Sequence, residues 1–182
     1  MDKDQDQALV EGCRNGDRAA FATLVIRYRQ PIYNAAFRVL GNADDAADAA
    51  QSVFLKVAER LGEYDPRFRF FSWIYRIAVN ESIDLLRRNG REVPLEGEEE
   101  LPGAEGADPE RQADEAQVSR KVQAALMRMK ADDRVVITLR HFADCSYREI
   151  GQILALDEKT VKSRLYEARG RLRGLLGELR DH

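Results

Sequence analysis

An acidic segment at residues 92–115 constrains this chain more than any other feature, because it cannot form a core of its own. Its 24 residues hold ten Asp or Glu, one Arg and three of the chain's five prolines, with few large apolar side chains. Such a composition buries too little apolar surface to offset the entropy lost on ordering. We therefore predict two small helical domains, residues 1–91 and 118–182, joined by a flexible acidic linker at residues 92–117.

The charge of the chain is divided unevenly by this segment. Ten acidic residues less one arginine give the segment a net charge of −9, and because the whole chain carries −3, the rest carries +6. A basic protein with an acidic insert suits a polyanionic partner such as nucleic acid. The segment itself is either a solvated spacer, extended by self-repulsion, or an anionic strip that lies in a positively charged channel of a partner.

Outside this segment the apolar residues recur with the period of an α-helix, so we expect an all-α fold. In the first half, a short helix precedes a longer one that ends at Gly41, and Pro31 is expected to bend or break the longer helix. Asn42 or Asp44 is expected to cap the third helix. A fourth helix is predicted from about residue 70 to 88.

The second half carries the signature of a helix-turn-helix. Ser146 with Glu149 three residues later forms a capping-box pattern, which predicts the start of a short helix that reaches Leu154. Asp157 is expected to cap a longer helix that continues through Leu176. A short helix, a tight turn and a longer helix are typical of a DNA-binding unit whose second helix enters the major groove.

Hydrogen-bond donors and one flat ring collect on the outward side of this second helix. Successive helical residues lie about 100° apart, which places five residues on an inner stripe: Val161, Leu165, Ala168, Leu172 and Leu175. The opposite side presents residue types that contact phosphates and base edges in a major groove: Lys159, Lys162, Ser163, Tyr166 and Arg173. The alternative is an ordinary solvated face of an amphipathic helix.

The segment from Tyr64 to Arg88 mixes aromatic and cationic side chains, a composition that suits opened, single-stranded DNA. Unpaired bases offer flat faces on which Tyr64, Phe68 and Phe70 would stack, while the arginines would neutralise the phosphates. This interpretation requires the three rings to lie in an exposed loop. The alternative, a helix that simply fills a core, is expected to hold for four apolar residues: Trp73, Ile74, Ile77 and Leu85.

Several other classes of site are not expected. Cys13 and Cys145 stand far apart without a histidine ligand pattern, so neither a zinc site nor a disulfide framework is indicated. We predict no cofactor, no metal and no catalytic residues. The acidic N-terminus lacks the apolar run of a signal peptide, and no stretch of about 18 apolar residues is present. The expected protein is cytoplasmic, without membrane insertion.

Four stretches of this sequence resemble the extracytoplasmic-function (ECF) sigma factors, the smallest class of specificity subunits of bacterial RNA polymerase. The stretches are AFATLVIRYRQPIY, DDAADAAQSVFLKVAERL and FFSWIYRIAVNESIDLLRR in the first half, and YREIGQILALDEKTVKSRLYEARGRLRGLL in the second. The resemblance covers about residues 8–90 and 118–178. It implies a protein that is not an enzyme, binds the clamp helices and flap of core RNA polymerase, recognises the −35 and −10 promoter elements, and promotes DNA melting.

The same resemblance assigns residues to three surfaces. Polymerase contacts are expected from Asp48, Gln51, Ser52, Leu55 and Lys56. Contacts with the −10 element, as single-stranded DNA, are expected from Tyr64, Phe68, Arg69, Arg76, Asn80 and Asp84. Contacts with the −35 element, as duplex, are expected from Lys159, Thr160, Lys162, Ser163, Tyr166, Glu167, Arg169 and Arg173.

Three positions depart from the family pattern. Ser52 stands where the family usually has glutamate, which removes one charged contact. Glu167 stands where arginine is common, and its carboxylate would accept a hydrogen bond from a cytosine amino group instead of pairing with phosphate. Asp157-Glu158-Lys159 replaces the usual Pro-x-Gly before Thr160.

The residues alone leave two other functions open. A stand-alone helix-turn-helix repressor or activator would use residues 146–176 and leave the aromatic loop without a role. An all-helical interaction scaffold would have no DNA affinity even with polymerase present. The family often uses an anti-sigma factor as an inhibitor, so such a partner is possible for this chain.

Overall fold

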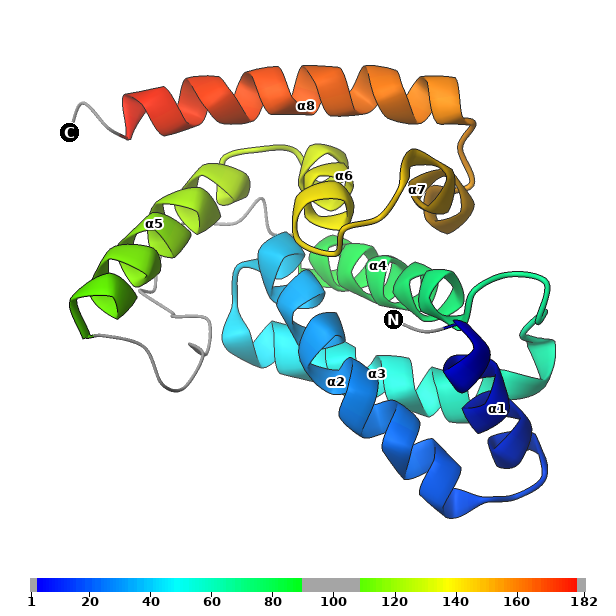
Figure 1. Cartoon of the computed structure of the whole chain (residues 1–182). Coiled ribbons are helices and arrows are strands. Elements are labelled where there is room, and N and C mark those ends of the chain that lie inside the picture. Colours follow the sequence, from blue (N-terminus) through cyan, green and yellow to red (C-terminus); the bar gives the residue numbers. More distant parts are fainter. Residues whose placement is uncertain (1–2, 90–108, 180–182) are drawn as a thin grey trace.

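The computed structural model describes residues 3–89 and 109–179, and the residues it describes form eight α-helices and one 3-10 turn, without strands. The all-α prediction is confirmed (Figure 1). Most of the predicted acidic linker lies outside the described residues. The elements, in chain order, are α1 Lys3–Arg14, α2 Arg18–Leu40, α3 Ala43–Arg60, the 3-10 turn Leu61–Glu63, α4 Phe70–Asn89, α5 Pro109–Met127, α6 Ala131–His141, α7 Tyr147–Leu154 and α8 Glu158–Glu178.

Side-chain caps set the ends of the helices in the first half. Between the two candidates for the cap of α3, the structure selects Asn42, whose side chain accepts a hydrogen bond of 2.8 Å from the backbone N–H of Asp45. Gly41 ends α2 in a left-handed conformation (φ 74°) that glycine adopts without steric cost. Pro31 lies inside α2 without ending the helix, and the neighbouring Ile32 is fully buried.

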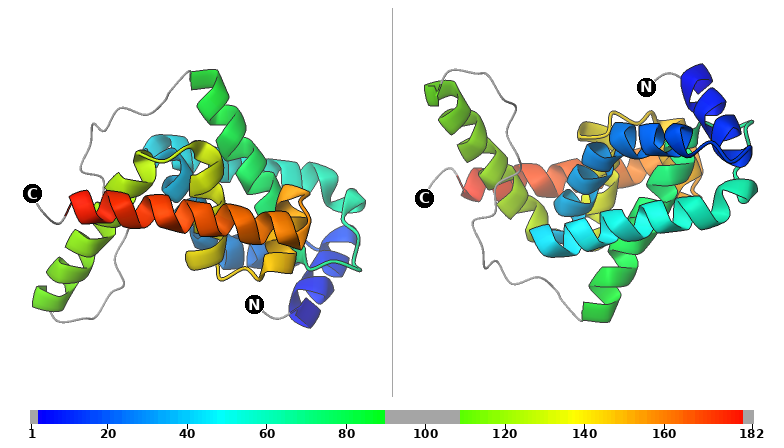
Figure 2. Two further views of the ribbon diagram at one scale, coloured as in Figure 1. Left: turned by 90° about the horizontal axis from the view of Figure 1, so that it is seen from above. Right: turned by 90° about the horizontal axis from the view of Figure 1, so that it is seen from below.

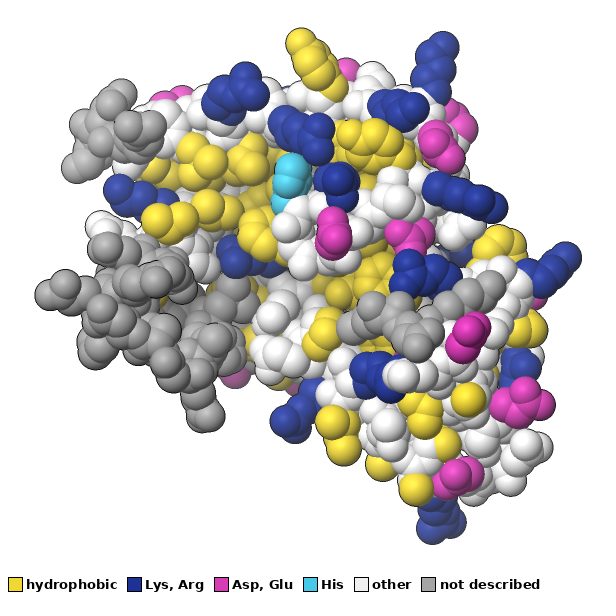
Figure 3. All heavy atoms as spheres, in the orientation of Figure 1, with side chains coloured by type: hydrophobic (Ala, Val, Ile, Leu, Met, Phe, Trp, Pro, Cys, Tyr) yellow, Lys and Arg dark blue, Asp and Glu magenta, His cyan; other side chains and the backbone are white. Residues whose placement is uncertain are grey.

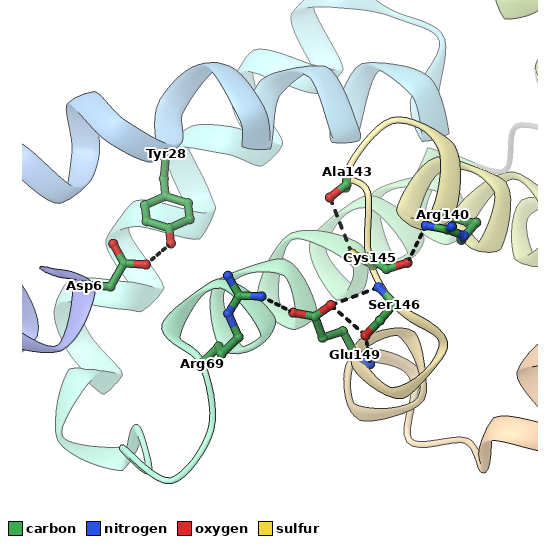
Figure 4. A network of polar contacts seen from close by, with 8 residues as sticks. All are labelled: Asp6, Tyr28, Arg69, Arg140, Ala143, Cys145, Ser146 and Glu149. Atoms are coloured by element: carbon green, nitrogen blue, oxygen red, sulfur yellow. Dashed lines mark hydrogen bonds and ion pairs between the residues drawn. The ribbon is translucent and has the colours of Figure 1, made fainter. Parts of the chain in front are cut away.

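Helix α1 is fixed to α2 by a buried polar contact. The Tyr28 hydroxyl donates a hydrogen bond of 2.6 Å to an Asp6 carboxylate oxygen (Figure 4). Arg27 donates to the other carboxylate oxygen, also at 2.6 Å. Burial and then the hydrogen bond to the Asp6 carboxylate raise the pKa of Tyr28 far above its usual value, so the phenol stays protonated and keeps donating. The contact places α1 against the bundle formed by α2, α3 and α4.

Helix α5 begins at Pro109, a residue favoured at the first position of a helix. The last nine residues of the predicted linker, 109–117, are therefore helical. The expectation of a flexible linker as far as residue 117 is wrong for this part, because the apolar pattern that begins at Val118 continues a helix that starts two turns earlier.

The helix-turn-helix has the predicted boundaries. Ser146 and Glu149 form a reciprocal capping box at the start of α7, and the Asp157 side chain accepts from the Thr160 N–H at 2.8 Å at the start of α8. Ala155 ends α7 with a φ of 54°. The turn is tight, since a Cβ added at Gly151 would lie 2.6 Å from the backbone oxygen of Leu156.

The two halves share one hydrophobic core. Helix α6 packs against α2, and α7 packs against α4, so the second half lies directly on the first (Figures 1 and 2). Every residue from Asp133 to Leu139 in α6 is buried, which requires neighbours on all sides of that helix. A small cavity of about 10 Å³ lies where Val39 and Val79 of the first half meet Val135 of the second. The two predicted domains therefore pack directly against each other.

We predict that Gly151→Ala destabilises the chain by about 1 to 3 kcal/mol, because the new methyl group would overlap a backbone oxygen that cannot move without distorting the turn. Gly170→Ala on α8 is the matched control, since its Cβ would meet nothing within 4 Å. The control should be neutral or stabilising by up to about 1 kcal/mol, because alanine favours the helix. Urea unfolding of both variants measures the difference, and equal midpoints would contradict the prediction.

Candidate nucleic-acid interface

The outward face of α8 has the exposure expected of a DNA-contacting surface. Lys159, Lys162, Ser163, Tyr166 and Arg173 are all exposed, and Tyr166 is 81% exposed. The inner stripe is buried at Val161, Leu165 and Ala168, as predicted, whereas Leu172 and Leu175 are half-buried and pack against the core. Figure 3 shows Lys and Arg side chains spread along the upper part of the molecule, where Figure 1 places α8. A helix that is held by its apolar side presents this basic face to the surroundings.

Some of the predicted −35 residues already have partners within the protein. Glu167 pairs with Arg171 at 3.2 Å, and Arg171 also pairs with Asp133 of α6. The Thr160 hydroxyl donates to the Asp157 carboxylate at 2.7 Å, so it supports the helix cap. A contact between the Glu167 carboxylate and a DNA base would therefore compete with the internal ion pair to Arg171.

Arg169, another predicted −35 residue, donates a hydrogen bond of 3.1 Å from Nε to Nε2 of His141. Burial, followed by the charges of Arg169 and Arg140, lowers the pKa of His141. The imidazole therefore remains neutral at neutral pH and can accept the bond from Arg169. This contact orients the guanidinium of Arg169 at the edge of the basic face.

Two of the three aromatic rings predicted to stack on bases are buried. Tyr64 is 2% exposed and Phe70 is 1% exposed, and their rings meet edge to face with centroids 5.5 Å apart. The Tyr64 hydroxyl donates to the backbone oxygen of Phe68 at 2.7 Å, which allows the phenol to be buried without losing its hydrogen bond. The prediction that Tyr64 and Phe70 are exposed stacking platforms is wrong, whereas Phe68 is 44% exposed.

The apolar residues of α4 do fill the core as expected. Ile74 is fully buried, Trp73 and Ile77 are packed against the main core, and Leu85 packs against a smaller cluster beside α3. The aromatic segment is thus mainly a structural cluster with a single exposed ring. Its composition resembled that of a base-stacking loop because packed aromatic clusters use the same residues.

Three of the predicted −10 residues form a row on the exposed side of α4. Arg76, Asn80 and Asp84 are spaced four residues apart, and all three are exposed. Arg76 and Asn80 line an open cleft of about 260 Å³, and Arg164 of α8 and Leu154 of α7 lie on its other side. Arg76 and Asn80 therefore face the helix-turn-helix across a cleft, whereas Asp84 lies outside it.

Arg69 has a partner in the other half of the chain. Its Nη1 donates to Oε1 of Glu149 at 2.5 Å, and Glu149 belongs to the capping box of α7 (Figure 4). Sequence reasoning assigned Arg69 to DNA and Glu149 to a helix cap, and no local pattern signals that the two residues, 80 positions apart, meet.

The predicted polymerase surface lies on α3. Asp48, Gln51 and Leu55 are exposed, and Leu55 is 60% exposed, which is unusual for a leucine side chain. Ser52 is half-buried. Lys56 is half-buried, because its ammonium group pairs with the carboxylate of Glu81 on α4, a residue that is 6% exposed.

Two further contacts between the halves have no signal in the sequence. The guanidinium of Arg38 on α2 lies 4.2 Å from the ring centroid of Phe142, which follows α6. The Arg38 side chain is also within 3.4 Å of Gln123 and 3.3 Å of Ser119 on α5. These residues are not part of any motif, and only the packing of the two halves brings them together.

Residues 3–89 and 109–179 contain no group of three or more His, Cys, Asp or Glu side chains placed to hold a metal ion. Within the same residues, every helix is too short or too polar to cross a membrane. Cys145 is buried and Cys13 is half-buried, and both are free thiols.

Comparison with known proteins gives matches over both halves of the chain. Residues 24–92 match the family Sigma-70 region 2, and residues 119–172 match the family Sigma-70, region 4. RNA polymerase sigma-H factor of Pseudomonas aeruginosa is 32% identical over 180 residues, covering 93% of this chain and 92% of that protein. ECF RNA polymerase sigma factor SigW of Bacillus subtilis is 33% identical over 181 residues, covering 93% and 96%.

Two solved structures are also similar. CnrH in complex with the cytosolic domain of CnrY has a TM-score of 0.71 at 25% identity, covering 96% of this chain and 98% of that one. The sigma factor RpoE in complex with the anti-sigma factor NepR, from Bartonella quintana, has a TM-score of 0.70 at 24% identity, covering 86% and 96%, which is a likeness of fold.

We predict that Tyr64→Ala lowers the free energy of unfolding by about 3 to 5 kcal/mol, as for other buried aromatic residues. Phe68→Ala, four residues away, should cost less than about 1 kcal/mol, because its ring is exposed. Urea denaturation measures both values. A Phe68 variant that is as unstable as the Tyr64 variant would mean that the loop is packed differently.

Proposed function

The chain belongs to the extracytoplasmic-function sigma factors of bacterial RNA polymerase, and on that premise we propose how its three exposed surfaces bind core polymerase and open promoter DNA. The observation that carries the proposal is the separation of these surfaces. The basic face of α8, the row on α4 and the exposed side of α3 each lie on a different helix, and each is held by a buried apolar stripe. One chain can therefore contact two promoter elements and the polymerase together.

The face of α8 binds the −35 element as duplex DNA. Lys162 and Arg173 donate to phosphates or base edges, and the exposed Tyr166 ring lies between them on the face that enters the major groove. Glu167 accepts from a cytosine amino group after it releases Arg171. At the base pair that Glu167 contacts, the −35 sequence preferred by this chain consequently differs from the one preferred by a relative that has arginine at this position.

The row on α4 and the exposed Phe68 ring contact the −10 element as single-stranded DNA. Extruding one base costs a few kcal/mol of lost stacking, and one aromatic ring returns about 1 to 3 kcal/mol. With Tyr64 and Phe70 buried, Phe68 is the one exposed ring of the three originally expected to stack. The isolated chain therefore does not open a promoter, and melting depends on further contacts supplied by polymerase.

The exposed side of α3 docks on core polymerase. Leu55 supplies an apolar anchor, and Asp48 and Gln51 supply polar contacts around it. Lys56 contributes less than expected from sequence, because it neutralises the buried carboxylate of Glu81. The docking surface is thus centred on Leu55.

The remaining assignments follow from the family. The protein carries out no chemistry itself and leaves nucleotide addition to polymerase, so it is not an enzyme. It acts where polymerase acts, in the cytoplasm. Two similar structures are complexes named for CnrY and for the anti-sigma factor NepR, which supports an inhibitory protein partner for this chain as well.

Run-off transcription with core polymerase on a library of genomic fragments tests the function and reveals the promoter sequence. Permanganate-reactive thymines near −10 should appear only with polymerase and this chain together. Protection of duplex DNA without such thymines, and without polymerase binding, would instead identify a stand-alone helix-turn-helix regulator.

We predict that Lys162→Ala weakens binding of the polymerase complex to −35 duplex DNA. Tyr166→Ala should weaken the same binding by a factor that depends on the DNA sequence of the −35 element. If Lys162 contacts phosphate, its removal should reduce the dependence of log K on log salt by about one unit. Lys121→Ala, an exposed lysine on α5, is the matched control and should change neither quantity. Equal losses from Lys121 and Lys162 would show that only net charge matters.

A further inference from the structure

A cavity of about 300 Å³ lies where α6 packs on the C-terminal half of α2 (Figures 1 and 2). Residues of α2 between Gln30 and Arg38 line one side, Tyr75 of α4 lines another, and Thr138 and Phe142 close it from α6 and the turn that follows. Its volume is at the lower end of the range for small-molecule sites, about 300 to 1,000 Å³. None of its lining residues is assigned to DNA or polymerase.

Arg38 is the one charged side chain among the described residues that line this cavity, and it is 8% exposed. Its guanidinium donates to Oε1 of Gln123 at 3.4 Å and to Oγ of Ser119 at 3.3 Å, and both acceptors are neutral and distant. Two such bonds leave most of the five N–H donors without an acceptor. Burial lowers the pKa of Arg38 to about 10, so the group is still cationic at neutral pH.

The other polar groups around the cavity also supply donors. The Thr138 hydroxyl is buried and has no hydrogen-bond partner among the described residues. Burial raises the pKa of Tyr75, so its phenol keeps its proton. The side-chain oxygen of Asn34 already accepts from Gln30 at 2.8 Å, which leaves the Asn34 amide nitrogen as a donor. Within the described part of the chain, no Asp or Glu lines the cavity. A buried cation surrounded by donors is suited to an anion.

The remaining wall is apolar. The guanidinium of Arg38 lies 4.2 Å from the ring centroid of Phe142, and this stacking holds the planar group in one orientation. A fixed guanidinium can donate two parallel hydrogen bonds to a carboxylate or a phosphate. Pro31 and Ala143 extend the apolar wall beside it. An anion that carries an apolar group would therefore be held more tightly than a bare inorganic ion.

We propose that this cavity is a binding site for a small organic anion, whose carboxylate or phosphate group accepts hydrogen bonds from Arg38 and Thr138 and whose apolar part lies against Phe142. The site is separate from the surfaces proposed to bind DNA and polymerase, because it shares no residue with them. Since the ligand binds the folded chain, it raises the melting temperature in proportion to its occupancy.

Titration of the full-length chain with four probes tests the site, using ligand-observed NMR and the melting temperature. Benzoate and phenyl phosphate carry the two candidate anionic groups, benzamide is the neutral analogue of benzoate, and inorganic phosphate lacks an apolar part. We expect one or both organic anions to bind at least about tenfold more tightly than benzamide, because charge-assisted hydrogen bonds are lost in the amide. The tighter of the two identifies the preferred group.

Two outcomes of this titration would overturn the proposal. Benzamide that binds as tightly as both organic anions would show an apolar crevice without anion recognition. Inorganic phosphate that binds as tightly as phenyl phosphate, with no binding of benzoate, would show a general attraction of phosphate and no organic ligand site.

Variants place the binding at this cavity. Arg38→Met should weaken binding of the preferred probe about ten- to hundredfold, the loss of a charge-assisted hydrogen bond, and Thr138→Val about two- to tenfold, the loss of a neutral one. Both replace poorly paired buried polar groups by apolar ones of similar size, so neither should lower stability, and urea unfolding checks this.

Arg18→Met is the matched control, because it is the same substitution at an exposed position on the same helix. Its affinity for the probe should stay within about twofold of the parent chain, as for a screened surface charge. Equal losses from Arg18→Met and Arg38→Met would reduce the effect to net charge and overturn the site. Full affinity in Thr138→Val and Arg38→Met together would place the probe elsewhere and overturn it as well.

The anion site and the proposed function fail separately. A chain that directs run-off transcription but binds no probe would overturn the site and leave the sigma-factor function intact. A chain that binds the probes as expected but does not bind polymerase would support the site and contradict the function.

Discussion

Helix α6 must be enclosed on all sides, and this requirement organises the rest of the structure. Its residues from Asp133 to Leu139 are all buried, with α8 and α7 on one side and α2 on another. A helix that is buried around most of its circumference, with Asp133, Arg134 and Thr138 among its buried residues, needs neighbours from more than its own half. The contact between the halves, the position of the helix-turn-helix and the burial of Thr138 all follow from that need.

The outward surfaces depend on the same packing. The inner stripes of α3, α4 and α8 are held in a common core, so each of these helices keeps an exposed polar side. The basic face of α8 and the exposed side of α3 lie on opposite faces of the molecule (Figure 2). Such a chain presents the surfaces proposed to bind polymerase and duplex DNA at the same time, while Arg76 and Asn80 of α4 line the cleft between the halves.

Local features of the fold could be predicted from the sequence, and contacts between distant residues could not. The capping box at Ser146, the cap at Asp157 and the inner stripe of α8 depend on residues within a few positions of one another, so their pattern is sufficient. The exposure of Tyr64 was predicted wrongly, because the same aromatic composition serves a base-stacking loop and a packed cluster. The pairing of Lys56 with Glu81 has no sequence signal, since it depends on how α3 lies on α4.

Glu149 accepts hydrogen bonds from both Ser146 and Arg69, and these two contacts limit which residues can replace it. Glutamine at that position would keep the start of α7 but lose the charge that meets Arg69, and a shorter aspartate would not span the same distance to both partners. Natural variation there is thus restricted by two separate requirements, one local and one between distant segments. Lineages that relax either requirement should change residue 69 together with residue 149.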